Sequence, residues 1–207
     1  MKTMSMSAFW LRVRGSVARM RDDCNGIAAT EFAVIVPMML VMFLGTVEIS
    51  SGIAVDRKVK LVARALADLT SQSSADMNDS FVTNVFTASI AILSPYSATP
   101  TQATLSEIYV DSNQVAKIQW SKAATIANGA ATLATSSHNP GDVVTVPSKL
   151  LVKQTYLILG EVSYLYTPAV GYVMGKSGVT LSDASYTRPR QVVCVTYNTV
   201  PVGCPTP

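Results

Sequence analysis

A single carboxylate lies inside the most apolar stretch of the chain. Glu31 is followed by uncharged, mainly apolar residues from Phe32 to Val47, and the next acidic residue is Glu48. A charged side chain in a lipid-facing helix carries a large free-energy cost unless a partner compensates it. Glu31 is therefore a predicted functional residue, and the chemistry that it offers is charge pairing.

Gly26 ends a basic leader and stands just before this apolar stretch. Glycine leaves the backbone at a scissile bond unhindered, so a membrane peptidase that cuts after Gly26 would release an ammonium group on Ile27. In a bundle of such helices, Glu31 of one subunit can pair with the Ile27 ammonium of its neighbour. The cost of desolvating both charges offsets much of their Coulomb attraction. The pair would therefore fix the register between neighbouring subunits more than it would stabilise their assembly. Alternatively, Glu31 reaches back to the membrane surface.

Two other kinds of processing fit the sequence less well. A secretory signal peptide needs small residues shortly after its apolar region, and Gly52 and Ala54 come only after Glu48. A bacterial lipoprotein needs its cysteine after the apolar region, whereas Cys24 precedes it. Cleavage after Gly26 instead keeps the apolar segment as the start of the mature chain.

The composition indicates a membrane protein with a neutral main domain. Of the 207 residues, 49% are hydrophobic and only 14% are charged, which is apolar for a soluble domain. The net charge of +3 belongs to the leader, where Lys2 and four arginines outnumber Asp22 and Asp23. We therefore expect no nucleic acid as a partner.

The apolar stretch is long enough to cross a membrane. A helix over residues 27–54 rises about 1.5 Å per residue and can span a hydrocarbon core of about 30 Å. Basic residues flank the apolar stretch on both sides. The leader contains more of them near the stretch, which favours a cytoplasmic N-terminus and a C-terminus on the other side of the membrane. Pro37 is expected to kink this helix or to be simply tolerated in it.

The segment from Gly26 to Phe32 resembles a type IV prepilin processing site, with glycine as the last leader residue and glutamate as the fifth mature residue. Glu31 followed by the aromatic Phe32 is similar to the Flp-type prepilins and the TadE/TadF-like pseudopilins of tight-adherence (Tad) pili. Pro37 in the helix, with Gly45 and Glu48 at its far end, resembles the TadE-like pattern specifically. Residues 161–168 and 186–190 show a weaker similarity to the tail of such proteins.

The resemblance implies a non-enzymatic minor pilin or pseudopilin, structural or assembly-related, of a Tad-type (type IVb) pilus. Its implied partners are a prepilin peptidase, membrane lipid, and other pilins or the assembly platform through the N-terminal helix. It implies the bacterial inner membrane with a periplasmic C-terminal domain, or an extracellular position in a pilus, and no cofactor. An uncleaved, single-pass periplasmic adhesion or binding protein is the alternative.

Four regions follow from these observations. Residues 1–26 form the removed cytoplasmic leader, 27–54 the transmembrane helix, 55–74 an amphipathic extension, and 75–207 a periplasmic globular domain. In the extension, a heptad-like apolar stripe runs through Val55, Val59, Val62, Leu66 and Leu69. We expect this stripe to pack on the chain's own domain, with a partner helix as the alternative.

The globular domain is predicted to be α+β, with a helix packed on a small antiparallel sheet, as in pilins. Asp76 or Asn78 is expected to cap the helix, which Pro95 ends. The side chains predicted to face the core are Phe81, Val82, Val85, Ala88 and Ile92. Strands are predicted over 105–110 and 115–120 as a hairpin, and over 155–166, 179–188 and 191–197, with a long loop over 128–142.

Cysteine usage is consistent with export. Removal of the leader takes Cys24 away and leaves Cys194 and Cys204, which are predicted to form a disulfide in the periplasm. In a cytosolic protein the two would stay reduced.

Residues suited to catalysis are sparse. His138, Glu107, Asp111 and Asp142 are scattered in the sequence and are predicted to be solvated. No cysteine or histidine cluster has the spacing of a metal site, and no phosphate-binding glycine loop occurs. Tyrosines are frequent in the last third of the chain. We expect them to pack within strands, and a protein-binding interface is the less favoured role.

Overall fold

The computed structural model describes residues 25–74, 76–127, 129–168 and 178–200. The chain divides between Val47 and Glu48 into two compact units. The predicted leader therefore lies almost wholly outside the described residues, as does Cys204.

The first unit contains the apolar part of helix α2, which runs over Asn25–Ser71 and contains Pro37. Every described residue from 28 to 47 whose side chain is large and apolar is at least partly exposed, and Val41 and Met42 are about 70% exposed. An apolar helix without a covering surface is typical of a segment that meets lipid or other helices. The helix is assigned as continuous through Pro37, and the expected kink stays a prediction.

The second unit is an α+β domain that includes the rest of α2. Helix α3 spans Asp79–Ile90, and a five-stranded antiparallel sheet has the order β3-β2-β1-β4-β5. The predicted fold class is confirmed. The strands are β1 (Thr101–Val110), β2 (Ala116–Ala127), β3 (Ala130–Ala134), β4 (Thr155–Tyr166) and β5 (Val179–Thr187), with short 3₁₀ turns η1 (Ala91–Leu93) and η2 (Ser148–Leu150).

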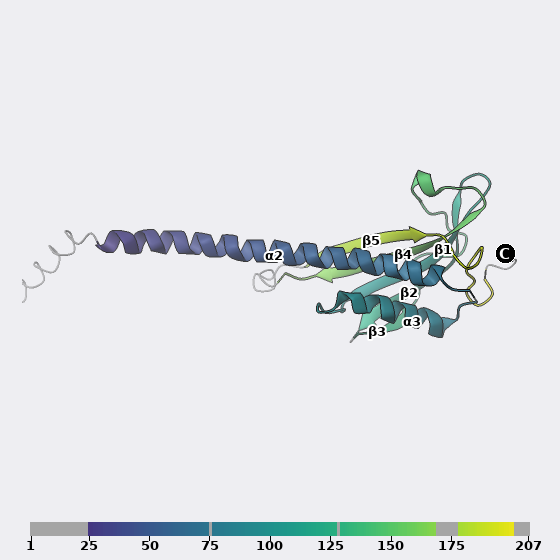
Figure 1. Cartoon of the computed structure of the whole chain (residues 1–207), viewed down its shortest axis with the longest axis horizontal. Coiled ribbons are helices and arrows are strands. Elements are labelled where there is room, and N and C mark those ends of the chain that lie inside the picture. The colour runs from purple at the N-terminus through teal and green to yellow at the C-terminus, as the bar shows by residue number, and fades with distance from the viewer. Residues whose placement is uncertain (1–24, 75, 128, 169–177, 201–207) are drawn as a thin grey trace, which may run out of the picture. The chain divides into compact units, whose positions relative to one another are not determined.

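The two helices pack on the same face of this sheet, as the buried residues show (Figure 1). Val55, Val59, Val62 and Leu66 of α2 are fully buried, so the predicted packing on the chain's own domain is confirmed. Leu69, in contrast, is 37% exposed, and Thr70 is buried in its place. A straight helix has 3.6 residues per turn, so a strict heptad stripe drifts off the buried face over its length.

Gly160 of β4 allows α2 to approach the sheet closely. A Cβ atom at this position would lie 2.7 Å from the backbone carbonyl oxygen of Ala63 and 3.2 Å from the Leu66 Cβ. Real Cβ atoms do not approach a backbone oxygen so closely, so only glycine fits here without a shift of the helix. This contact sets how closely α2 approaches β4.

Helix α3 begins where the sequence indicated, but it buries a different set of side chains. The Asn78 Oδ1 accepts the backbone N–H of Phe81 at 2.9 Å, which confirms Asn78 as the cap. Phe81 and Ala88 are exposed, so their predicted core positions are wrong, whereas Ile92 is half-buried and packs against the core as predicted. Phe86 and Ile90 are buried with Val82 and Val85. The larger Phe86 thus enters the core, and the stripe that buries it excludes Ala88.

Two strand predictions also need correction. Residues 191–197 contain no strand; Tyr197 only forms isolated bridges with Met77 and Val200. The predicted loop over 128–142 contains β3, which pairs with β2 through Ala127 and Ala130. The Asn128-Gly129 dipeptide is a strong hairpin signal, and Gly129 has the positive φ of 76° that such a turn requires.

Candidate functional site

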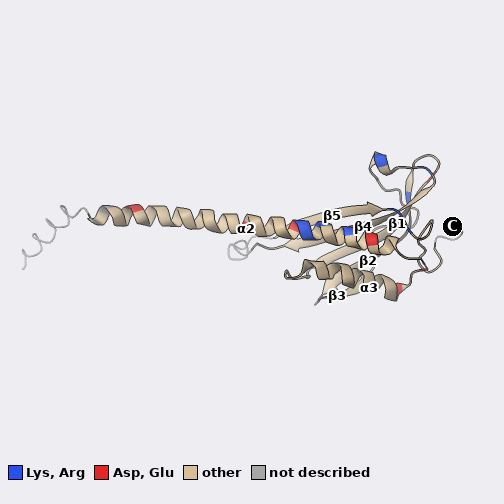
Figure 2. Cartoon of the chain, viewed as in Figure 1, with Lys and Arg blue, Asp and Glu red and all other residues tan. Residues whose placement is uncertain are grey.

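The predicted processing and assembly residues lie at the start of α2. One helix in the described part of the chain is long and apolar enough to cross a membrane, and its most apolar window is exposed throughout. Glu31 and Phe32 are exposed on this helix, Phe32 by 69%. Glu31 has no ion pair with any described residue. Figure 2 shows the charge-poor stretch that follows it.

Glu48, the first residue of the second unit, contacts the end of the sheet. The Tyr166 hydroxyl, at the end of β4, donates to the Glu48 Oε2 at 3.5 Å. A Cβ atom on Gly52, one turn further along α2, would be 3.6 Å from the Tyr166 ring. Burial and the nearby Glu48 carboxylate raise the pKa of the Tyr166 hydroxyl, so it stays a neutral donor. Glu48 therefore connects the start of the second unit to the end of β4.

A buried glutamate holds the C-terminal segment of the domain. Glu107 in β1 is fully buried, and its Oε1 accepts the backbone N–H of Val195 at 2.6 Å. The neighbouring Trp120 indole N–H donates to the Val195 carbonyl at 2.8 Å. The Glu107 Oε2 has no hydrogen-bond partner. Burial raises the pKa of Glu107 to about 8, against the lowering effect of the Val195 N–H and Trp120. The prediction that Glu107 is solvated is wrong.

The predicted disulfide concerns the same segment. Cys194 precedes Val195, is 3% exposed and is disulfide-bonded. Because Cys204 lies outside the described residues, the pairing of Cys194 with Cys204 stays a prediction.

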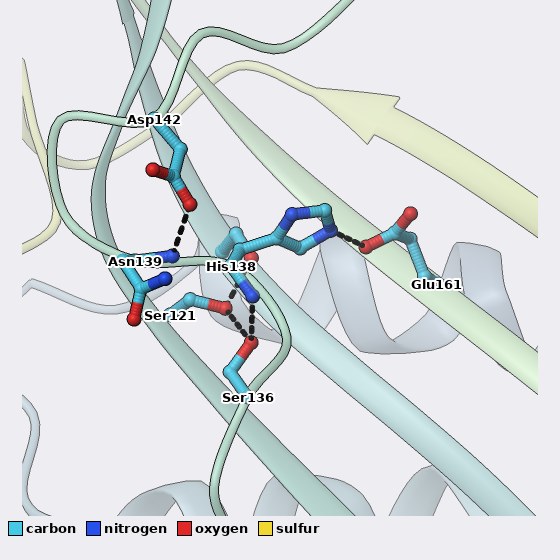
Figure 3. A network of polar contacts seen from close by, with 7 residues as sticks. Ser121, Ser136, His138, Asn139, Asp142 and Glu161 are labelled. Carbon is cyan, nitrogen blue, oxygen red and sulfur yellow. Dashed lines mark hydrogen bonds and ion pairs between the residues drawn. The ribbon is translucent and has the colours of Figure 1, made fainter.

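A polar network occupies the sheet face opposite the helices (Figure 3). The His138 Nε2 lies 2.9 Å from the Glu161 Oε2 in β4. The backbone N–H of His138 donates to the Ser136 hydroxyl at 3.1 Å, and a chain of hydroxyl contacts continues to Ser121 and Ser106. His138 is therefore half-buried and paired, and not the freely solvated residue that its loop position suggested.

Through the contacts of Ser136 with Ser121 and of His138 with Glu161, this network holds the loop after β3 against the sheet. The Asp142 Oδ2 accepts the backbone N–H of Asn139 at 2.7 Å and tightens the same loop. A nucleophile would need a hydrogen bond to the imidazole, and Ser136 contacts the backbone nitrogen of His138 instead. The described residues hold no group of three or more His, Cys, Asp or Glu side chains that fits a metal ion.

The structure brings together residues that sequence patterns left separate. Glu48 meets Tyr166, Glu107 meets Val195, and His138 meets Glu161. Only Glu48 carried a sequence signal, through its place at the end of the apolar stretch. Glu31, Phe32 and Pro37 belong to the first unit, and none of these three contacts involves them.

Comparison with known proteins gives one match. The family model described as TadE-like protein matches residues 26–68. No curated protein and no solved structure matches the chain. The matched segment contains Gly26, Glu31, Pro37 and Glu48, and ends before residues 161–168 and 186–190, so the weaker similarity there has no support from it. The match supports a Tad pilus-associated protein, and the apolar helix indicates a membrane anchor. The match confirms the resemblance over this segment: residues 26–68 are similar to the TadE-like family.

Proposed function

We propose that this protein is a non-enzymatic minor pilin or pseudopilin, a structural or assembly component of a Tad-type (type IVb) pilus. The observation that carries the proposal is the coincidence of two features in one segment. The TadE-like match covers residues 26–68, and this segment includes an apolar window of helix α2 in which no residue is buried. Glu31 is the single acidic residue between Asp23 and Glu48.

Each proposed partner is assigned to a part of this helix. A prepilin peptidase cuts between Gly26 and Ile27. Lipid surrounds the apolar residues before assembly, and helices of other pilins or the assembly platform replace the lipid afterwards. The α+β unit lies in the periplasm, and it reaches the cell exterior if the protein enters the fibre. This topology is supported by the basic leader and by the disulfide at Cys194.

Processing is the first test. N-terminal sequencing of the membrane-extracted mature protein should begin at Ile27. A Gly26→Leu variant should remain a full-length precursor in cells that contain the cognate peptidase. Gly45→Leu is the matched control, because a Cβ there meets nothing within 4 Å, and it should be cut normally. A mature chain that begins at Val55 would show secretory cleavage, and a chain that is never cut would favour the uncleaved periplasmic adhesion or binding protein.

Assembly is the second test. Glu31→Ala should still be cleaved and inserted, but pilus formation should be strongly reduced, because the Ile27 ammonium of the neighbouring subunit loses its partner. Ser50→Ala, an exposed polar position on the same helix, should leave pilus formation unchanged. Counting surface pili by electron microscopy measures both. Normal piliation by Glu31→Ala would mean that Glu31 only reaches the membrane surface.

A further inference from the structure

One asparagine of the chain stands in a pattern that accepts a covalent sugar. The sequence contains seven asparagines, and only Asn78, in Asn78-Asp79-Ser80, is followed by a serine or threonine two positions later. With no proline between them, these residues form the acceptor pattern for attachment of an oligosaccharide to the asparagine amide. Asp76 adds an exposed carboxylate two residues before the asparagine, which a transferase can recognise with a basic group.

The fold presents Asn78 at the surface of the second unit. The preceding residue, Met77, is buried. Its backbone N–H donates to the Thr196 carbonyl at 2.8 Å, and its carbonyl accepts the N–H of Asn198 at 2.9 Å. Asn78 itself is exposed, as are the two residues that follow it, and its backbone is extended with φ −120° and ψ 175°. The acceptor asparagine therefore lies at a fixed and solvent-accessible point.

The cap of α3 uses the oxygen of the Asn78 amide and leaves its nitrogen free. The Oδ1 must be the atom turned toward the Phe81 backbone, because a backbone N–H requires an acceptor. The Nδ2, to which a sugar would be bonded, has no hydrogen-bond partner among the described residues. An amide that is substituted on its nitrogen keeps its carbonyl oxygen. Attachment of a sugar and capping of α3 are therefore compatible.

We propose that Asn78 is an N-glycosylation site, modified by a membrane-bound oligosaccharyltransferase. The Nδ2 forms a bond to the anomeric carbon of a sugar that is carried on a lipid diphosphate. The bond from that carbon to the diphosphate oxygen breaks, the diphosphate leaves with the electron pair, and the Nδ2 gives one proton to a basic group of the transferase. Because an oligosaccharide is bulky and hydrated, the start of α3 then stays outside contacts between subunits. The inference rests on the proposed periplasmic position of the second unit.

Peptide mapping of the protein from the cells that produce it tests the site. The chain is extracted from membranes, and mass spectrometry with fragmentation that preserves the bond between sugar and asparagine locates the modification. Ser80→Ala removes the acceptor pattern and leaves the cap of α3 in place, because the cap uses the Asn78 side chain. Asn78→Gln removes the acceptor itself. Asn84→Gln is the matched control, an exposed asparagine of α3 that lacks a serine or threonine two positions later.

The expected result is a sugar on Asn78 in the parent and in Asn84→Gln, and its complete loss in Ser80→Ala and in Asn78→Gln. Unmodified Asn78 in protein that begins at Ile27 would overturn the inference and leave the proposed function intact. A sugar that persists in Ser80→Ala, or that lies on a serine or threonine in place of Asn78, would also overturn the inference. A sugar on Asn78 of a chain that keeps its leader would support the inference and contradict the proposed processing. An uncut and unmodified chain would overturn both.

Discussion

The Oε1 atom of Glu107 accepts the backbone N–H of Val195 at 2.6 Å, and this hydrogen bond joins residues 88 positions apart. It fastens the C-terminal segment to the sheet beside the disulfide-bonded Cys194. The other carboxyl oxygen has no partner. A carboxyl group in such a place is stable when protonated and costly when ionised.

Stability should therefore fall as pH rises. The pKa of Glu107 is raised by burial from its ordinary value of 4.5 to about 8 in the folded protein. The unfolded chain binds fewer protons than the folded one between these values, so the stabilising contribution is complete below about 4.5 and is lost as pH rises through 8. The slope is about 1.4 kcal/mol per pH unit for one group. Thermal unfolding at pH 5, 7 and 8.5 measures it.

Glu107→Gln should remove most of this pH dependence. The glutamine Oε1 keeps the hydrogen bond to Val195, and the amide does not ionise. The variant should unfold at a higher temperature than the parent at pH 8.5 and near the parent's temperature at pH 5. Asp142→Asn, which changes an exposed carboxylate, should keep the parent's slope. The same slope in Glu107→Gln as in the parent would assign the pH dependence to other groups.

Gly160→Ala should destabilise the α+β unit by about 1–3 kcal/mol, because overpacking forces a shift of the backbone. The added Cβ would stand 2.7 Å from the Ala63 carbonyl oxygen, so α2 must move away from β4. The change should lower the unfolding midpoint of the domain in denaturant. Gly45→Ala makes the same chemical change where a Cβ meets nothing within 4 Å, and its domain midpoint should equal the parent's. Equal midpoints for Gly160→Ala and the parent would mean that the helix accommodates a methyl group freely.

Cys194 and Cys204 should be joined in the exported protein. Closing a loop of about ten residues stabilises a domain by roughly 2–3 kcal/mol in the chain-entropy description. Mass spectrometry of peptides from non-reduced, exported protein should show the linked pair. The paired variants Cys194→Ser and Cys204→Ser should lower the unfolding midpoint equally, because each removes the same bridge. Free thiols at both positions, or a bridge from Cys194 to Cys24, would contradict the pairing and the proposed topology.

Local patterns predicted the elements whose signals lie within a few residues. The hairpin predicted from residues 105–110 and 115–120 is formed by β1 and β2, and at its turn the Asp111 Oδ1 accepts the backbone N–H groups of Asn113 and Val115. The strand predicted over 155–166 has the bounds of β4. In α3 the predicted face was right for Val82 and Val85 and wrong for Phe81 and Ala88, which are exposed. The domain bounds, the cleavage site and the roles of Glu31 and Phe32 remain predictions.

The sequence by itself determined the apolar helix, its single glutamate and the TadE-like pattern over residues 26–68, because each depends on residue types at short spacing. Only the tertiary structure decided that Glu107 is buried under Val195 and that His138 reaches Glu161. These contacts depend on strand register and on how closely α2 approaches Gly160. No local pattern encodes them, because the residues involved become neighbours only when the sheet and the helices pack together.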